Sequence, residues 1–105
     1  MSRFAFEFSV PADHPSLAGH FPGHPVVPGV LLLDEALRAL AQATGRSIGR
    51  LQQVKFVAAL LPGELAQGHW DVTESRASFR VSVRRGGGEV KLAEGAGELS
   101  AEAVQ

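Results

Sequence analysis

The chain has 105 residues, of which 45% are hydrophobic and 20% charged, and its formal net charge is −1. This length and composition are typical of a globular protein, so we expect a single domain over residues 1–105. The near-neutral charge excludes a general basic surface for nucleic acid. The sequence contains no cysteine, which excludes disulfides, thiol catalysis and thiolate metal sites.

The first residues predict a strand and not a targeting signal. Residues 3–10 alternate, with Phe4, Phe6, Phe8 and Val10 on one face, which is typical of a half-buried strand with an aromatic inner face. This alternation replaces the continuous apolar run of a signal peptide, and no apolar segment is long enough to span a membrane. We therefore expect a soluble, cytoplasmic protein without membrane insertion.

Residues 19–29 form the most unusual segment of the chain. Within it, prolines, glycines and histidines crowd together: Gly19, His20, Pro22, Gly23, His24, Pro25, Pro28 and Gly29. Proline restricts φ and lacks a backbone donor, whereas glycine reaches backbone angles that are closed to other residues. A loop built this way is expected to be rigid and to carry a functional site, with the rest of the chain as its scaffold.

Residues 29–44 predict the only long helix. Good helix formers dominate the segment, Pro28 suits the start of a helix, and Gly45 suits its end. Its polar side chains form one narrow stripe: Glu35, Arg38, Gln42 and Arg46. At about 100° per residue, Asp34 lies about 40° beyond the nearer edge of this stripe, toward the apolar side.

The rest of the chain predicts strands and turns. The strands are expected over residues 51–60, 64–74, 76–84 and 89–100. The turns are Leu61-Pro62-Gly63-Glu64 and Gly86-Gly87-Gly88. One long helix and one antiparallel sheet predict an α+β fold whose sheet curls around the helix. Because a single helix cannot cover both faces of a sheet, we expect a dimer that extends the sheet or buries an edge.

Residues 20–31 resemble the signature of the 3-hydroxyacyl-[acyl-carrier-protein] dehydratases. They read His20-Phe21-Pro22-Gly23-His24-Pro25-Val26-Val27-Pro28-Gly29-Val30-Leu31, and an acid, Asp34, follows. The likeness extends more loosely to Lys55-Phe56 and Leu61-Pro62-Gly63-Glu64. It implies a hotdog fold, with one long central helix wrapped by a curved antiparallel β-sheet. It also implies dehydration of a 3-hydroxyacyl thioester to the trans-2-enoyl thioester, in fatty-acid, polyketide or aryl-polyene-type lipid synthesis.

The resemblance also implies roles for particular residues. The family's catalytic histidine falls on His20, its catalytic acid on Asp34, and its oxyanion donor on the backbone N–H of Gly29. The expected substrate-binding residues are Phe21, Val30, Leu33 and Phe56. Apart from Phe21, these apolar residues are equally expected as core. In the family, each active site lies at a dimer interface and takes its histidine and its acid from different subunits.

The partners implied by the resemblance are an acyl carrier protein and a second copy of the chain, in a homodimer or higher homo-oligomer. No metal or cofactor is expected, because the phosphopantetheine arm belongs to the carrier protein. His24 follows His20 at a spacing that suggests a metal pair, but Pro22 and Gly23 between them prevent a helix, and no third ligand is close. We therefore expect a structural role for His24.

The chemistry of dehydration suits these residues. A neutral imidazole such as that of His20 titrates near working pH and can remove the C2 proton of the substrate. Asp34 suits delivery of a proton to the leaving hydroxyl, directly or through water, if it is buried. Without the motif, His20 would be read as a loop histidine and Asp34 as a first-turn acid that complements the helix dipole. The motif and the offset of Asp34 favour catalysis, whereas Glu35 better fits the structural role.

Two other functions stay open at this point. A hotdog acyl thioesterase would hydrolyse the thioester with a water-activating acid and would not need His20. A catalytically weak acyl-binding or assembly subunit of a dehydratase is favoured by two departures from the family pattern: Arg38 replaces a glutamine, and Val27 replaces a methionine or phenylalanine. Basic residues from Arg46 to Arg85 could meet an acidic carrier protein, but most such charges simply form a solvated strand face.

Overall fold

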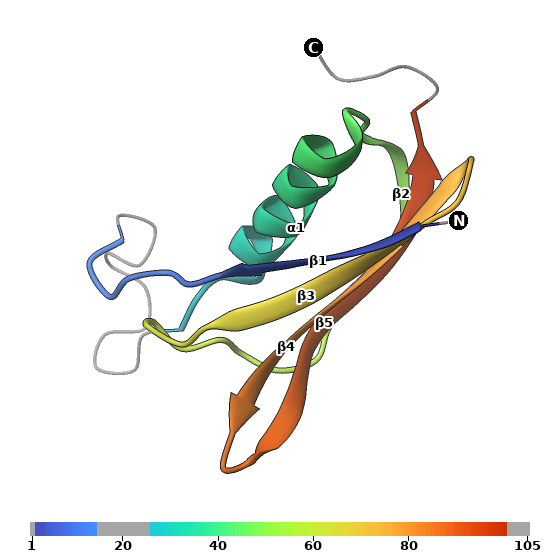
Figure 1. Cartoon of the computed structure of the whole chain (residues 1–105). Helices are drawn as coiled ribbons and strands as arrows, with labels where there is room; N and C mark the ends of the chain where they lie inside the picture. Colours follow the sequence, from blue (N-terminus) through green and yellow to red (C-terminus); the bar gives the residue numbers. More distant parts are fainter. Residues whose placement is uncertain (1, 15–25, 101–105) are drawn as a thin grey trace.

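A computed structural model describes residues 2–14 and 26–100. Its elements are β1 (Ser2–Phe8), α1 (Gly29–Thr44), β2 (Ile48–Phe56), β3 (Ala66–Val72), β4 (Arg76–Arg85) and β5 (Gly88–Leu99). The strands form one antiparallel sheet in the order β1-β3-β4-β5-β2 (Figure 1). The predicted α+β architecture is therefore confirmed, with β1 and β2 as the two edges of the sheet.

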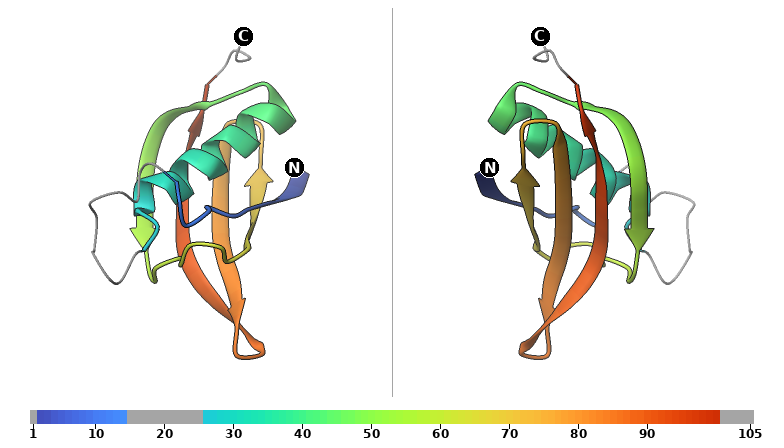
Figure 2. Two further views of the ribbon diagram at one scale, coloured as in Figure 1. Left: turned by 90° about the vertical axis from the view of Figure 1, so that its left-hand side faces the viewer. Right: turned by 90° about the vertical axis from the view of Figure 1, so that its right-hand side faces the viewer.

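Helix α1 packs across the concave face of the curved sheet (Figure 2). Its buried residues are Leu32, Ala36 and Leu40, which share one side of the helix. From the sheet, Trp70 is fully buried, and its Nε1 donates a hydrogen bond to the carbonyl oxygen of Ala36 at 2.7 Å. The indole ring also packs against Phe79, with ring centroids 4.9 Å apart. These contacts make one core between the helix and the sheet.

The helix begins and ends where the sequence predicts. Pro28 precedes its first residue, and Gly45 ends it in the left-handed conformation, with φ of 70° and its N–H bonded to the Ala41 carbonyl. The prediction that Arg46 continues the polar stripe is wrong, because Gly45 turns the chain away from the helix axis. Arg46 instead donates hydrogen bonds to the carbonyl oxygens of Ser100 and Glu74.

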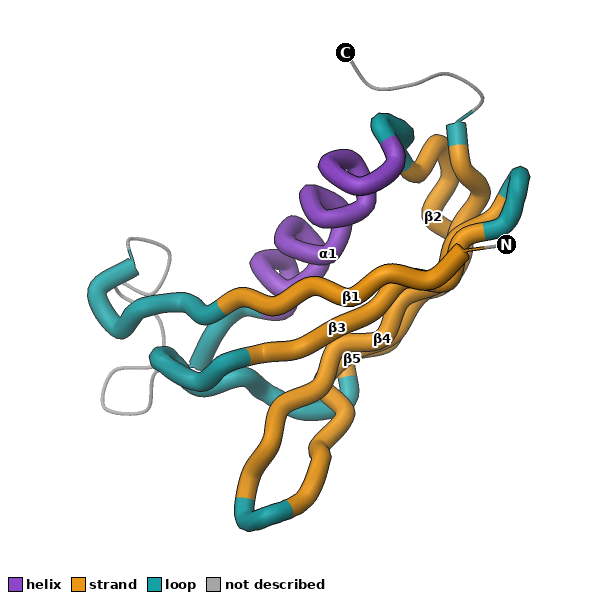
Figure 3. Tube along the Cα trace, in the orientation of Figure 1, coloured by secondary structure: helices purple, strands orange, loops and turns teal. Residues whose placement is uncertain are grey.

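The segment after β2 differs most from the predicted strands. The sequence predicts a strand over residues 51–60, whereas β2 ends at Phe56. Residues 57–65 then leave the edge of the sheet and cross β5 and β4 on the side that faces α1, as the loop between β2 and β3 shows (Figures 2 and 3). They must cross because β3 lies on the far side of β4 and β5 from β2.

The last strand, Gly88–Leu99, agrees in length with the predicted strand over residues 89–100. The glycines Gly95 and Gly97 predict a weak strand, yet β5 runs for 12 residues. Their lack of a side chain makes room for close neighbours. A Cβ at Gly95 would lie 2.6 Å from the Phe79 ring, and one at Gly97 would lie 2.6 Å from the Arg50 carbonyl oxygen. The same glycines that lower strand propensity therefore allow dense packing at this end of the sheet.

Edge strand β2 is largely exposed to solvent. Most of its residues are exposed, and its outer edge has no strand partner in the described part of the chain. Exposed large apolar residues lie on β2, at the start of α1 and in the crossing segment: Val30, Leu51, Phe56, Val57, Leu61 and Leu65. The expectation that a second subunit covers this region stays a prediction. Within residues 2–14 and 26–100, no helix has the length and apolar character that crossing a bilayer requires.

Substituting Trp70 tests the contact between helix and sheet. We expect Trp70→Phe to lower the free energy of unfolding by about 2–3 kcal/mol, because it removes buried volume and the hydrogen bond to Ala36. Urea denaturation followed by far-ultraviolet circular dichroism measures the change at fixed protein concentration. The control is Gln67→Thr on the exposed face of the same strand, which should change stability by less than about 0.5 kcal/mol. Equal effects of the two substitutions would contradict this account.

Candidate active site

The start of α1 offers backbone donors to a ligand. Gly29 is the first helical residue, and Pro28 provides no side-chain cap. The first N–H groups of a helix have no acceptor inside the helix, and the helix dipole makes this end positive. An oxygen that gains negative charge is therefore stabilised beside Gly29, where the sequence predicts an oxyanion donor.

A cavity of about 320 Å³ opens at this helix start. It is lined by Val27, Gly29, Leu32, Phe56, Val57, Ala58, Ala59 and Leu60. The ring of Phe56 lies so close to Gly29 that an added Cβ would be 3.0 Å from its Cδ1. Glycine at position 29 thus lets an aromatic wall approach the backbone. Two residues predicted to bind substrate or oxyanion, Gly29 and Phe56, are brought together here.

Asp34 lies on the exposed side of α1, past its first turn. The first turn contains no acidic residue, so the reading of Asp34 as a first-turn acid is wrong. Val30, one turn earlier, shares this side of the helix and is 60% exposed, whereas Leu33 is half-buried. The burial that proton delivery by Asp34 requires is therefore absent from a single chain.

The neighbours of Asp34 take up structural roles. The Glu35 carboxylate lies 3.5 Å from the Arg38 guanidinium, in an ion pair along the helix surface. Both side chains are partly solvated, so the pair adds little stability. This agrees with the expected structural role of Glu35. It also shows that Arg38, which departs from the family pattern, is held by Glu35.

His20, Phe21 and His24 lie outside the described residues, but the chain on either side of residues 15–25 is well anchored. The carbonyl oxygen of Val10 accepts a hydrogen bond from the Gly63 N–H at 2.8 Å. The Val27 N–H donates to the Leu60 carbonyl, also at 2.8 Å. Both Val10 and Val27 are buried. Both anchors therefore lie on the segment that crosses from β2 to β3.

The crossing segment owes its shape to Glu64 and Arg85. Gly63 has φ of 85°, which suits glycine, and the Glu64 carboxylate accepts the Leu61 N–H at 2.8 Å. Arg85 binds the same carboxylate through two nitrogens and also donates to the Ala59 carbonyl. The hydrogen bond from Arg85 is the main reason that the pKa of Glu64 lies below its usual value. Sequence reasoning missed Arg85, because no local pattern connects it to the turn at Glu64.

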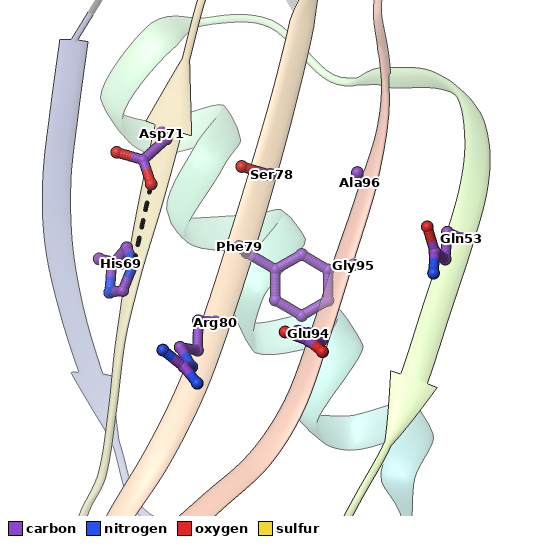
Figure 4. Close-up of a pocket in the computed structure, with 9 residues that line it drawn as sticks. All are labelled: Gln53, His69, Asp71, Ser78, Phe79, Arg80, Glu94, Gly95 and Ala96. Carbon is purple, nitrogen blue, oxygen red and sulfur yellow. Dashed lines mark ion pairs between the residues drawn. The ribbon is translucent and has the colours of Figure 1, made fainter.

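A second cavity, of about 430 Å³, lies on the sheet face that points away from α1 (Figure 4). It is lined by Gln53, His69, Asp71, Ser78, Phe79, Arg80, Glu94, Gly95 and Ala96. Its carboxylates are already paired: Asp71 with Arg3 at 2.6 Å, and Glu94 with Lys91 at 3.0 Å. His69 lies 3.8 Å from Asp71. None of the predicted site residues with a described position lines this cavity, so the one beside Gly29 is the candidate site.

Comparison with known families and proteins indicates the family of the chain. Residues 1–95 match the model of the ApeI-like family, described as ApeI dehydratase. The 3-hydroxyacyl-[acyl-carrier-protein] dehydratase FabZ of Klebsiella pneumoniae is 46% identical over 57 residues, which is 54% of this chain. FabZ of Salmonella arizonae matches equally well. The match spans 32% of the length of these curated relatives.

Solved structures confirm the hotdog fold. An uncharacterized protein from Erwinia carotovora subsp. atroseptica superposes with a TM-score of 0.79 at 24% identity, covering 93% of this chain and 82% of its own. The dehydratase heterocomplex ApeI:P from Xenorhabdus doucetiae superposes with a TM-score of 0.73 at 24% identity, covering 92% of this chain and 86% of its own. A mutant of the fluoroacetyl-CoA-specific thioesterase FlK superposes with a TM-score of 0.57 at 23% identity, covering 94% of this chain and 90% of its own. At such identities the likeness establishes the fold alone.

The lowered pKa of Glu64 predicts a pH-dependent contribution to stability. Because the pKa is lower in the folded chain, the contribution is complete above the ordinary value of 4.5 and is lost as pH falls through the folded value. The difference in unfolding free energy between wild type and Glu64→Gln should therefore be constant near neutral pH and shrink in acid. Urea titrations at several pH values measure it. In an Arg85→Ala background this pH dependence should largely disappear, and its persistence there would show that Arg85 is not the cause.

Proposed function

The chain belongs to the ApeI-like dehydratase family, and from this premise we propose that it dehydrates a 3-hydroxyacyl thioester on acyl carrier protein to the trans-2-enoyl thioester. The observation that carries the proposal is the arrangement on α1. Gly29 presents a helix N-terminus to an apolar cavity, and Asp34 follows on the exposed side of the same helix. The helix rises about 1.5 Å per residue, so the two Cα atoms are separated by about 7.5 Å along its axis.

This spacing suits a substrate that is attacked at two neighbouring carbons. Helical side chains lean toward the N-terminus, so the Asp34 carboxylate lies nearer the level of Gly29 along the axis than its Cα does, on the exposed side of the helix. A thioester oxygen beside the Gly29 N–H places C3, with its hydroxyl, two bonds beyond the carbonyl carbon. To Asp34 we assign delivery of a proton to this hydroxyl, directly or through one water, at an interface where the exposed side of α1 meets the substrate.

We assign the proton transfers as follows. His20 removes a proton from C2 as its neutral imidazole, and the electron pair moves into the thioester, where the Gly29 N–H stabilises the negative oxygen. The electrons then form the C2–C3 double bond as the hydroxyl leaves C3, and Asp34 protonates it to water. The products are one enoyl thioester and one water, and the proton on His20 returns to Asp34 through solvent.

The exposure of the remaining site residues supports an active site that two subunits complete. Val30 is 60% exposed and Phe56 51% exposed in one chain, although both are assigned to substrate binding together with Phe21 and Leu33. A second chain against β2 would cover them and would remove Asp34 from water. In this homodimer His20 and Asp34 come from different subunits, and the carrier protein delivers the substrate on its phosphopantetheine arm.

A second candidate is an assembly subunit that pairs with an active partner. It is favoured by the similarity to a chain of the dehydratase heterocomplex ApeI:P and by Arg38, which stands where the dehydratases have glutamine. An acyl thioesterase is the third candidate, since the fold is shared with one. The three functions differ in products, so one assay separates them.

The assay uses purified protein with a 3-hydroxyacyl thioester on carrier protein and follows both enoyl thioester and free thiol. We expect enoyl product without thiol, and we expect His20→Ala and Asp34→Asn each to lower kcat by about 10²–10⁴-fold, as for loss of a general acid or base. Glu35→Gln, at the neighbouring position on the helix, is the control and should keep most of the activity. Thiol without enoyl product would indicate a thioesterase, and neither product would indicate the assembly subunit.

Gly29→Ala tests whether the close approach of Phe56 to Gly29 matters for catalysis independently of protein stability. Alanine favours the helix over glycine by up to about 1 kcal/mol, so the thermal midpoint should stay equal or rise. The new Cβ displaces the Phe56 ring and shifts the cavity wall, so kcat should fall by about tenfold. Phe56→Leu in the Gly29→Ala background relieves the contact and should restore part of the loss. Full activity of Gly29→Ala alone would exclude this role for the contact.

A further inference from the structure

Half of the cavity lining beside Gly29 comes from the crossing segment. Val57, Ala58, Ala59 and Leu60 follow one another along this wall, opposite the start of α1. The first two are held by the sheet, since their N–H groups donate to the Leu92 carbonyl at 2.7 and 3.3 Å. Beyond Ala58 the segment leaves that support, so the position of the remaining wall depends on other contacts.

Leu60 connects this wall to the start of the helix. Its side chain is fully buried, and its carbonyl accepts the Val27 N–H in an isolated antiparallel bridge. Val27 immediately precedes Pro28 and Gly29, and proline leaves this short connection little freedom. A shift of Leu60 is therefore transmitted to the backbone that presents the Gly29 N–H.

Arg85 holds the segment on both sides of Leu60. Its Nη2 donates to the Ala59 carbonyl at 2.6 Å and to Glu64 Oε1 at 2.6 Å, and its Nε donates to Glu64 Oε2 at 2.8 Å. The two side chains are only 31% and 22% exposed, so water competes weakly for these hydrogen bonds. One guanidinium thus ties both flanks of the segment to the end of β4.

We infer that Arg85 is a positioning residue of the active site, which acts through Ala59, Leu60 and Glu64 on the cavity wall and on Gly29. This inference rests on the proposed dehydratase activity for its kinetic consequences. Among the described hydrogen bonds of Arg85, only the one to the Ala59 carbonyl reaches a residue that lines the cavity. Arg85 therefore takes no part in proton transfer. Its effect is on the alignment of the oxyanion donor, which matters most in the transition state.

The kinetic test compares Arg85→Ala and Arg85→Lys with Arg84→Ala. Arg84 precedes Arg85 on β4, is exposed on the opposite face of the sheet, and serves as a charge-matched control. We expect both Arg85 variants to lose about tenfold in kcat, with KM changed by less than about threefold, because alignment and not substrate binding is impaired. Lysine at position 85 should not restore kcat, because one ammonium group cannot make the hydrogen bonds that the planar guanidinium makes to Glu64 and Ala59 at the same time.

A double-variant cycle shows whether Arg85 acts through Glu64. Adding Glu64→Ala to Arg85→Ala should cause little further loss of kcat, since the two groups hold the same segment. Additive losses, wild-type kcat in Arg85→Lys, or an equal loss in Arg84→Ala would each overturn the inference.

Amide hydrogen exchange tests the positioning without any substrate. The Val27 N–H is protected by its bond to Leu60, so Arg85→Lys should speed its exchange by about tenfold relative to wild type and to Arg84→Ala. Unchanged exchange would overturn the inference. If the wild type forms no enoyl product, the proposed dehydratase activity fails, and exchange at Val27 still decides the role of Arg85. If Arg85→Ala does not fold, Arg85→Lys supplies both the kcat and the exchange rate of the Val27 N–H.

Discussion

The packing of α1 against Trp70 is the contact on which the rest of the structure depends. The indole N–H holds the Ala36 carbonyl, and this sets the rotation of the helix about its own axis. With Leu32 and Leu40 turned into the core, Asp34 must lie on the opposite, exposed side. One buried hydrogen bond between helix and sheet thus decides which residues of α1 are available for chemistry.

A single chain leaves the residues of the candidate site open to solvent. Gly29 and Phe56 meet at a cavity, while Asp34 and Val30 face solvent. Acid catalysis and apolar substrate binding both gain from exclusion of water. The outer edge of β2 has no strand partner among the described residues and exposes Leu51 and Phe56, and its cover by a second chain stays a prediction.

The start of α1 and the cavity wall at Phe56 were predictable from local sequence. The motif at residues 20–31 pointed to Gly29, which lines the cavity, whereas the roles assigned to Gly29 and Asp34 stay predictions. Helix periodicity separated Asp34 from Glu35, and Glu35 pairs with Arg38. Arg85 and the wall at residues 57–60 were not predictable, because they approach Gly29 only through chain crossing and hydrogen bonds between distant residues. The turn at Glu64 carried the only local signal, a glycine with a neighbouring carboxylate.

The sequence by itself determined the start and end of α1, the alternation of the strands and the family to which the motif points. These properties depend on proline, glycine and side-chain period, which act over a few residues. Only the tertiary structure decided where β2 ends, why β5 tolerates Gly95 and Gly97, and where Arg46 and Arg85 bind. Those outcomes depend on the order β1-β3-β4-β5-β2, which forces residues 57–65 across the sheet and brings together groups far apart in the chain.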